Sequence, residues 1–563
     1  MNKIKTNLKK ISFAIAASVA LFFTSCESTK QVVTLYTPLD YTADDAISTE
    51  IKRIETLSET EAVKALWRAK LLVDNTDLKI SFYQNTVDEL AKMEAIVSDS
   101  YKKALEEKNY FDAYRFYMSL SSCGYEKLSS LEKNKDDLIS LIQQNVPGLN
   151  TKKKSSEENV KVSSLIKGTV TVFVDKGLKF EKGMGYADGV IGSGFFISKD
   201  GYIVTNNHVI ADCVDPKNEG FTRLYIRLAE DPDTKIPAKV IGYDSVLDLA
   251  LIKAEVNAPY VFELGSSSAL DVGDKVYAIG SPLGLDRTLT SGIISAKDRK
   301  LFTVGNAFQI DAAVNSGNSG GPLIDEQGRV QAIVFAGVQN YQGLNFAIPV
   351  EYLKYELPVL YKGGKRVHPW TSSYGRTKKL PGSGTKNEGL EVQYVMPGGS
   401  AALGGLKEDD VIYSFEGKTI ESLDDLQNEF IKLLPETIAT IKAKDKDGNE
   451  KSCLVYLDKR PEQPGYEIYT HDVVSNSFVP IVGMKMVSIS TVSKKKYSVA
   501  NVLKGSVADD MGFSENDPVD ILKVQFDEKK TSAYVEIYAK KRKNGYIDVS
   551  LGFNVSMDSP YYF

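Results

Sequence analysis

Residues 315–323 read Asn-Ser-Gly-Asn-Ser-Gly-Gly-Pro-Leu, so that Ser319 is followed directly by two glycines and a proline. A serine hydroxyl is a weak nucleophile at neutral pH, because it is protonated and needs an adjacent base. A glycine-rich turn exposes such a hydroxyl and leaves backbone amides free to stabilise an oxyanion. We interpret Ser319 as a candidate nucleophile, with the amides of Gly317 and Ser319 as its oxyanion hole. An ordinary loop is the alternative.

The candidate base is His208, one of three histidines in the chain and the only one within the strand-rich part. An imidazole that takes a proton needs a carboxylate to fix its tautomer. Asp248 lies in the apolar run Leu247–Ile252, where an unpaired carboxylate would be costly to bury. Taken alone, His208 could be a histidine of the core, and Asp248 could cap the end of a strand. Together with Ser319 they predict a catalytic triad.

The sequence around these residues is typical of an all-β domain. Short runs of apolar and β-branched residues alternate with glycine-rich turns, and this spacing predicts two β-barrels of about 100 residues each. The expected strands are Thr169–Val174, Gly192–Ile197, Tyr202–Thr205, Leu224–Leu228, Ala238–Ile241, Leu247–Ala254, Lys275–Ile279, Thr288–Ser295, Gly321–Ile324, Val330–Phe335 and Leu344–Ile348.

This region resembles the trypsin-like protease domain of the HtrA/DegP group, and we place that domain at residues 161–358. The matching segments are Gly192–Phe195, Gly201–Val209, Asp248–Lys253, Ala278–Gly284, Ser291–Ala296, Asp311–Leu323 and Gly343–Pro349. The resemblance implies that His208 is the general base, Asp248 its orienting group and Ser319 the nucleophile. Ser316 replaces the family's usual proline.

The resemblance also implies where the side chain before the scissile bond would bind. The expected pocket residues are Asp311, Ala312, Ala313, Asn345, Phe346 and Ala347. Ala313 stands where a basic-specific trypsin carries aspartate. Small or medium apolar side chains are therefore expected in the pocket.

Residues 370–460 resemble a PDZ domain through Gly389–Val395, Gly399–Ala402 and Gly405–Ile412. PDZ domains bind peptides by adding a strand to a sheet edge. Where the family has an apolar-Gly-apolar carboxylate loop, this chain has Trp-Thr-Ser-Ser-Tyr-Gly at residues 370–375. A PDZ fold used only for packing or regulation is therefore the alternative to peptide capture. Residues 480–558 look like a second, divergent copy, with Val482–Met484 as its loop.

Residues 1–26 are typical of an export signal. Lysines precede the apolar run Ile11–Phe23, whose helix of about 20 Å is too short for a bilayer core of about 30 Å. The segment resembles a bacterial lipoprotein signal, which implies that Cys26 is lipidated and becomes the mature N-terminus. An uncleaved membrane anchor is the alternative.

Residues 27–45 are expected to be a tether, residues 46–146 a helical module and residues 147–160 a linker. Apolar residues in the module recur at three- and four-residue steps with almost no glycine or proline. Residues 101–117 look like the joint of a tetratricopeptide helix pair. The module is interpreted either as a partner-binding unit or as a helical spacer packed on its neighbour.

Composition excludes several functional classes. The 563 residues predict about three to five domains, and Lys+Arg 69 against Asp+Glu 74 leaves no basic excess for binding nucleic acid. Three histidines and four scattered cysteines argue against a multi-histidine metal centre, a zinc site and a disulfide framework. We expect no metal and no organic cofactor.

Together these features predict a multidomain chain with an N-terminal α-helical module, a two-barrel trypsin-like domain and one or two PDZ-like α+β domains. We expect a membrane-tethered HtrA-like serine endopeptidase of the bacterial envelope, facing the periplasm or the cell exterior. Its partners would be misfolded or exposed envelope proteins, peptides at the PDZ-like domains and the membrane, and its assembly the family's usual homotrimer. The alternatives are a peptide-binding or chaperone-like scaffold with a silent or partner-activated protease fold, and a trypsin-like enzyme without PDZ regulation.

Overall fold

The computed structural model separates into two compact units, one comprising Thr37–Arg460 with Ser559–Phe563 and the other containing Pro461–Asp558. The described residues are 39–149, 161–181, 184–281, 287–301, 304–315, 317–337, 344–383, 386–489, 496–541 and 547–563. The predicted signal segment with Cys26, most of the tether and linker, Ser316 and Pro282–Gly284 lie outside them. Among the described residues, no helix is both long and apolar enough to cross a membrane.

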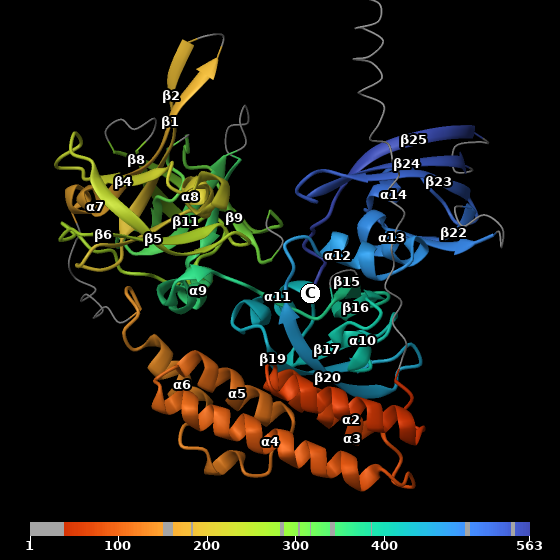
Figure 1. The fold of residues 1–563 in the computed structure, drawn as a ribbon. Coiled ribbons are helices and arrows are strands. Elements are labelled where there is room, and N and C mark those ends of the chain that lie inside the picture. Colours follow the sequence, from red (N-terminus) through yellow and green to blue (C-terminus); the bar gives the residue numbers. More distant parts are fainter. Residues whose placement is uncertain are drawn as a thin grey trace, which may run out of the picture. The chain divides into compact units, whose positions relative to one another are not determined.

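The first unit begins with the predicted helical module (Figure 1). Its helices are α2 (Asp44–Ser58), α3 (Ala62–Asn75), α4 (Tyr83–Glu106), α5 (Tyr110–Ser122), η1 (Leu128–Ser130) and α6 (Lys135–Gln143). Trp67 of α3 is buried, stacks on Tyr456 and donates its indole N–H to the Leu454 carbonyl at 2.9 Å. Because Leu454 and Tyr456 belong to the neighbouring sheet, this face of the module is packed on another domain, as in the spacer interpretation.

Two β-barrels follow the module, as predicted (Figure 1). The first is built from α7 (Val162–Gly168), β1 (Thr169–Glu181), β2 (Met184–Phe196), β3 (Tyr202–Thr205), α8 (Asn207–Val214), η2 (Pro216–Asn218), β4 (Arg223–Arg227), β5 (Ile236–Asp244) and β6 (Leu249–Ala254). Its strand order is β13-β5-β4-β1-β2-β3-β6, where β13 is the short strand Gly364–Lys365, and pairing between β5 and β6 closes the ring.

The second barrel has the order β10-β11-β12-β9-β8-β7 and is closed. Its elements are η3 (Ser267–Ala269), β7 (Lys275–Gly280), β8 (Thr288–Arg299), β9 (Ala307–Ile310), β10 (Pro322–Ile324), β11 (Val330–Gly337) and β12 (Asn345–Pro349). Helix α9 (Val350–Lys362) covers the barrel and continues through Pro358, where the sequence had suggested the end of the domain. Leu353, Leu357 and Leu360 of this helix enter the core between the barrels.

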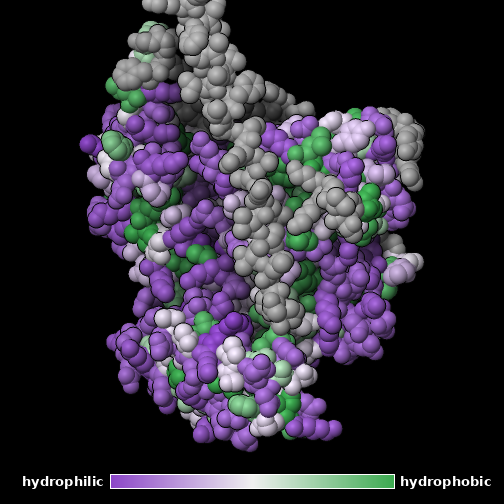
Figure 2. Space-filling view, turned by 45° about the vertical axis from the view of Figure 1, so that its right-hand side comes forward, coloured by the Kyte–Doolittle hydropathy of each residue, from purple (hydrophilic) through white to green (hydrophobic). Residues whose placement is uncertain are grey.

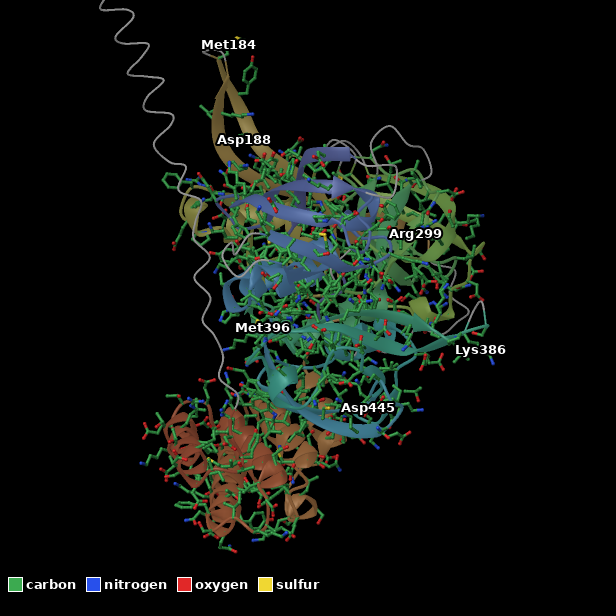
Figure 3. All side chains as sticks on the ribbon, turned by 90° about the vertical axis from the view of Figure 1, so that its right-hand side faces the viewer. Met184, Asp188, Arg299, Lys386, Met396 and Asp445 are labelled. Atoms are coloured by element: carbon green, nitrogen blue, oxygen red, sulfur yellow. The ribbon has the colours of Figure 1, made fainter. Side chains whose placement is uncertain are left out.

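The hairpin of β1 and β2 extends beyond the predicted strands and projects from the first barrel, with Met184 at its tip (Figures 1 and 3). Leu178, Met184 and Tyr186 are exposed on it. On the face drawn in Figure 2, hydrophilic side chains predominate and hydrophobic ones form separate groups.

The first PDZ-like domain is a sheet with order β14-β20-β19-β17-β16-β15, so β15 is an edge strand. Its elements are β13 (Gly364–Lys365), which joins the first barrel, then β14 (Pro369–Trp370), β15 (Ser373–Lys379), β16 (Asn387–Val395), α10 (Ser400–Leu403), β17 (Val411–Phe415), β18 (Lys418–Thr419), α11 (Leu423–Ile431), β19 (Thr437–Lys444) and β20 (Glu450–Lys459).

The second unit forms a sheet with strands in sequence order, β21 to β25. Its elements are α12 (Pro464–His471), α13 (Val474–Val482), β21 (Met484–Ser488), β22 (Lys496–Val502), α14 (Val507–Asp510), β23 (Pro518–Phe526), β24 (Ser532–Lys541) and β25 (Ile547–Ser556). Tyr469 and Phe478 belong to its core, so the unit begins well before the expected residue 480. Gly483, in the expected loop, ends α13 in the left-handed conformation at φ 84°.

Candidate active site

The structure brings His208 and Asp248 together. His208 is the second residue of α8, and Asp248 immediately precedes β6. His208 Nδ1 lies 2.7 Å from Asp248 Oδ2, and the backbone N–H of His208 donates to Asp248 Oδ1, also at 2.7 Å. One carboxylate therefore fixes both the ring and the main chain of the histidine. This leaves Nε2 as the ring nitrogen that is available for proton transfer.

Main-chain contacts hold Asp248 in place against α8. Its carbonyl accepts hydrogen bonds from Asn207 N at 3.2 Å and from Asn206 Nδ2 at 2.9 Å. Asp248 has φ 55°, a left-handed conformation that aspartate and asparagine tolerate better than most residues. The role of Asn206 was missed in the sequence, although it stands within the matching segment Gly201–Val209. The contact depends on the turn at Asp248, which lies about 40 residues away in sequence, so the residues around Asn206 give no sign of it.

The loop that carries Ser319 comes from the second barrel and is fastened to the first. Asn318 N donates to Asn315 O at 3.0 Å, closing a turn in which Gly317 has φ 102°. Glycine is favoured at such a position because it has no Cβ. Ser193 of β2 donates its hydroxyl to Gly317 O at 2.6 Å and its amide to Ser319 O at 2.7 Å. Ser193 thus couples the two barrels at the site.

Close packing also places this loop beside the histidine segment. A Cβ added to Gly320 would lie 2.2 Å from Ser193 O and 3.1 Å from Asn206 N. A Cβ added to Gly192 would meet Val209 and also Ser319 O. Both glycines are therefore needed for the approach of the two barrels. This approach brings Ser319 next to the segment that carries His208.

The Ser319 hydroxyl is not hydrogen-bonded to His208. Within the described residues it donates only to the Phe335 carbonyl of β11, at 3.1 Å. Rotation about the Cα–Cβ bond moves a serine oxygen between staggered positions, so a different rotamer is needed to reach the imidazole. Catalytic hydrogen bonds are often unformed in structures without substrate. The site therefore has a formed His–Asp pair and a candidate nucleophile whose hydroxyl is bonded to another strand.

The residues expected to form the oxyanion hole and the pocket belong to the second barrel, the barrel that also carries Ser319. Within the described part of the chain, the amides of Gly317 and Ser319 donate to no protein acceptor. Phe346 of β12 is buried, and its ring centroid lies 6.4 Å from that of Phe335. Asn345 donates its side-chain amide to Ala312 O at 2.8 Å. This hydrogen bond joins the two expected pocket segments, 311–313 and 345–347.

The remaining expected pocket residues are three alanines and an aspartate whose side chain is already hydrogen-bonded. Ala312 and Ala347 are buried, and Ala313 is exposed, its carbonyl accepting from Thr290 Oγ1 at 2.9 Å. The Asp311 carboxylate accepts the Ile293 amide at 2.6 Å. This carboxylate is therefore already used as a main-chain acceptor.

A cluster of metal-ligand side chains lies away from this serine. Among the described residues, Asp244, Glu356 and His368 form the one group close enough to hold a cation, and all three are buried. His368 Nε2 lies 2.9 Å from Asp244 Oδ2, and Arg366 Nε lies 2.9 Å from Glu356 Oε2. Because Asp244 already faces the His368 ring and Glu356 faces the Arg366 guanidinium, the cluster is better described as a buried network of polar side chains. It joins α9 and the first barrel to the start of the PDZ-like domain.

Comparisons with known proteins agree with this architecture. Residues 192–333 match the trypsin-like peptidase domain, and residues 374–438 match the PDZ domain. The chain is similar to the HtrA/DegP serine proteases. Residues 465–557 match the TP0546 family PDZ domain, and residues 45–142 match a domain of unknown function, DUF8517. The predicted fold, a helical module followed by a two-barrel trypsin-like domain and PDZ domains, is confirmed.

Relatives of this kind occur in several bacteria. A probable periplasmic DegP-like serine endoprotease of Pseudomonas fulva is 38% identical over 286 residues, which is 49% of this chain and 57% of the relative. Its Chlamydia pneumoniae counterpart is 33% identical over 333 residues, 56% of this chain and 63% of the relative. The chain thus spans about three fifths of the length of these relatives.

Solved structures include the HtrA-type protease AlgW with a decapeptide, at 25% identity and a TM-score of 0.45. The match covers 55% of this chain and 99% of AlgW.

Proposed function

We propose that this chain is a serine endopeptidase of the bacterial envelope that cuts polypeptides through an acyl-enzyme intermediate. The observation that carries the proposal is the pair of 2.7 Å contacts between His208 and Asp248, beside a loop that presents Ser319. Ser193 holds that loop against the barrel of the histidine. Such a pair serves to accept a proton from a serine hydroxyl and return it to a leaving amine.

In the proposed mechanism, Ser319 turns from the Phe335 carbonyl towards His208 Nε2 and attacks the scissile carbonyl carbon. His208 takes the hydroxyl proton, and the Asp248 carboxylate stabilises the resulting imidazolium. The amides of Gly317 and Ser319 bind the oxyanion, each such donor contributing on the order of 3 kcal/mol. His208 then protonates the departing amine, leaving an ester on Ser319. Water, activated by the same imidazole, hydrolyses this ester and restores the hydroxyl.

The proposed substrates are misfolded or exposed envelope proteins with small or medium apolar side chains before the cut. Buried Ala312 and Ala347 and the absence of an acidic residue at Ala313 support the apolar preference. The relatives from Pseudomonas fulva and Chlamydia pneumoniae are described as probable periplasmic endoproteases, which supports an envelope location. Homotrimeric assembly remains a prediction that sedimentation of the purified chain would check.

Cleavage of casein by residues 27–563 tests the proposal. Ser319→Ala should lower turnover by at least about 10⁴-fold. Ser140→Ala, on the exposed face of α6, is the matched control and should leave turnover unchanged. A fluorophosphonate probe should label the parent and Ser140→Ala but not Ser319→Ala. Cleavage that survives Ser319→Ala would contradict the proposed nucleophile.

A second candidate is a peptide-binding scaffold whose protease fold is silent or activated by a partner. The direction of the Ser319 hydroxyl favours this alternative, because it donates its hydrogen bond to the Phe335 carbonyl rather than to His208. A parent protein that neither cleaves casein nor reacts with the fluorophosphonate would support it. Cleavage that appears only after a peptide is added would support activation by a partner.

Lipid attachment at Cys26 is proposed from the resemblance of residues 1–26 to a lipoprotein signal. Radiolabelled palmitate should enter the parent chain in a bacterial host but not Cys26→Ser. Cys213→Ser, which changes a free thiol of the first barrel, is the control and should still be labelled. Equal labelling of all three would contradict attachment at Cys26.

A further inference from the structure

Residues 559–563, Ser-Pro-Tyr-Tyr-Phe, lie in the first PDZ domain rather than with the second unit that they follow in sequence. The segment runs antiparallel to edge strand β15. Phe563 N donates to Ser373 O at 3.0 Å, and Ser373 N donates to Phe563 O at 3.1 Å. Gly375 N donates to Tyr561 O at 3.1 Å, and Tyr562 pairs with Tyr374. The segment therefore satisfies an edge that would otherwise present unpaired backbone groups.

Its side chains fill space at the domain core. Phe563 is 2% exposed and belongs to the core cluster that includes Leu390 and Leu426. Gly375 makes room for it, since a Cβ there would lie 3.1 Å from the Phe563 ring. Tyr561 stacks under the Arg376 guanidinium, 4.4 Å from its ring centroid. Burial of an aromatic side chain is favourable, so the segment is bound by its rings as well as by its backbone.

The loop in which the sequence departs from the family pattern is the one that receives Phe563. The Thr371 hydroxyl donates to Phe563 O at 2.8 Å, and the amide of Ser373 donates to the same oxygen. Thr371, Ser372 and Ser373 are all buried. A hydroxyl and an amide thus supply the polar end of the groove without an apolar-Gly-apolar triplet.

Helix α11 forms the other wall of this groove. Gln427 donates its side-chain amide to Pro560 O at 2.5 Å. Its carbonyl oxygen accepts the amide of Gly305, in the protease domain, at 3.3 Å. One side chain therefore touches both the bound segment and the protease domain.

We propose that Ser559–Phe563 is a resident, exchangeable ligand of the first PDZ domain. The groove between β15 and α11 binds extended peptides that carry neighbouring tyrosine and phenylalanine residues, with phenylalanine in the buried position. The chain's own segment competes with such peptides. The inference rests on the proposed peptide-binding role of the PDZ domain and not on protease activity, so binding assays test it separately from cleavage.

Tethering sets the size of the competition. A segment joined by a short flexible connection has an effective concentration of about 1 mM. A free peptide that binds the emptied groove with a Kd of about 10 µM would then bind the intact chain about 100-fold more weakly. The contrast between intact and truncated chains is large enough to measure directly.

The experiment uses fluorescein-labelled Ser-Pro-Tyr-Tyr-Phe and fluorescence anisotropy, in a Ser319→Ala background so that no cleavage interferes. The chain lacking residues 559–563 should bind the peptide about 100-fold more tightly than the intact chain. A scrambled peptide, Tyr-Ser-Phe-Pro-Tyr, should not bind. Tyr534→Ala, which removes a half-exposed aromatic ring of the second unit, is the control and should behave like the intact chain.

Equal affinity of the intact and truncated chains, or no binding to either, would overturn the proposal. If truncation lowers the melting temperature, adding the peptide should restore it, because a ligand of the native state stabilises that state. A truncated domain that the peptide does not restore would show that the segment is a permanent structural strand, and the proposal would be wrong. Failure of casein cleavage would leave all of these binding results unaffected.

Discussion

Replacement of Asp248 by asparagine tests the proposed role of this carboxylate with little disturbance of the fold. Asparagine keeps the shape of aspartate and tolerates the left-handed backbone at φ 55°. Its carbonyl oxygen can still accept the backbone N–H of His208. The amide nitrogen then faces His208 Nδ1, which must accept a hydrogen bond rather than donate one. The ring proton is thereby placed on Nε2, where it blocks proton transfer from Ser319.

The expected loss is about 10⁴-fold in kcat, the scale found when a triad carboxylate is made neutral. This corresponds to about 5.4 kcal/mol of transition-state stabilisation, at 1.36 kcal/mol for each factor of ten. Stability should change far less, because asparagine keeps both contacts with His208 and only reverses the direction of the contact with the ring. By contrast, Asp248→Ala removes both acceptors and places in the left-handed region an alanine, which tolerates it less well than aspartate or asparagine does. It should therefore lower the free energy of unfolding by about 2–4 kcal/mol.

Initial rates of casein cleavage and urea unfolding curves, measured on the same preparations, separate the two effects. Asp248→Asn should be nearly inactive with an almost unchanged urea midpoint. Asp248→Ala should be inactive and less stable. An Asp248→Asn protein that keeps more than a tenth of the parent rate would refute the reasoning, because the tautomer argument allows no such activity.

Three other changes have outcomes set by particular contacts. Glu356→Gln removes the negative charge that faces the buried Arg366 and should lower the free energy of unfolding by about 3–5 kcal/mol in urea. Asp99→Asn, in an exposed pair, should cost less than about 1 kcal/mol. Partial burial raises the pKa of Glu436, but Lys459 and Arg115 lower it by more. The pKa of Glu436 therefore lies below its usual 4.5. Glu436 therefore contributes stability that is present above pH 4.5 and is lost as the pH falls through the lowered pKa. The urea midpoint should drop more steeply between pH 5 and pH 3 in the parent than in Glu436→Gln. Equal slopes in the two proteins would contradict this prediction. Gly320→Ala should abolish casein cleavage because its Cβ would lie 2.2 Å from Ser193 O, while Gly273→Ala, also left-handed but with open space around it, should keep the parent rate.

The barrels could be predicted because each strand carries its own local signal. The runs Tyr202–Thr205 and Leu247–Ala254 are apolar between turn residues, and they form β3 and β6 within a few residues of the expected bounds. The extension of β1 to Glu181 was missed because it depends on pairing with β2 across a bulge at Asp175–Gly177. Such cross-strand pairing has no local signature when the hairpin is exposed.

Two helices near expected domain boundaries contain a proline. Proline within an apolar run is usually a sign that a helix ends. In this chain α9 continues past Pro358, and α13 contains Pro480. Both helices bury apolar residues on each side of the proline, and this packing outweighs the lost hydrogen bond. A sequence pattern reports the cost of the proline but not the tertiary contacts that offset it.

For the site, the sequence indicated which residues to consider but not their contacts. The proximity of His208 and Asp248 could be predicted because a carboxylate in an apolar run needs a hydrogen-bond partner and a catalytic imidazole needs a carboxylate. The direction of the Ser319 hydroxyl does not, since staggered rotamers of serine differ little in energy and the Phe335 carbonyl comes from another strand. Activity in solution depends on how readily that hydroxyl exchanges Phe335 for the imidazole.

The contacts of helix α11 give a physical reason to measure cleavage and peptide binding together. Its Asp424 accepts Asn306 Nδ2 at 3.1 Å, and Asn428 accepts the Tyr352 hydroxyl at 3.2 Å, so the protease domain holds this helix by side chains about one turn apart. Between them, Gln427 contacts Gly305 and Pro560. A change of ligand in the groove must therefore occur against a wall that the protease domain already fixes. Such a wall favours ligands that fit it without moving it, and Ser559–Phe563 is one.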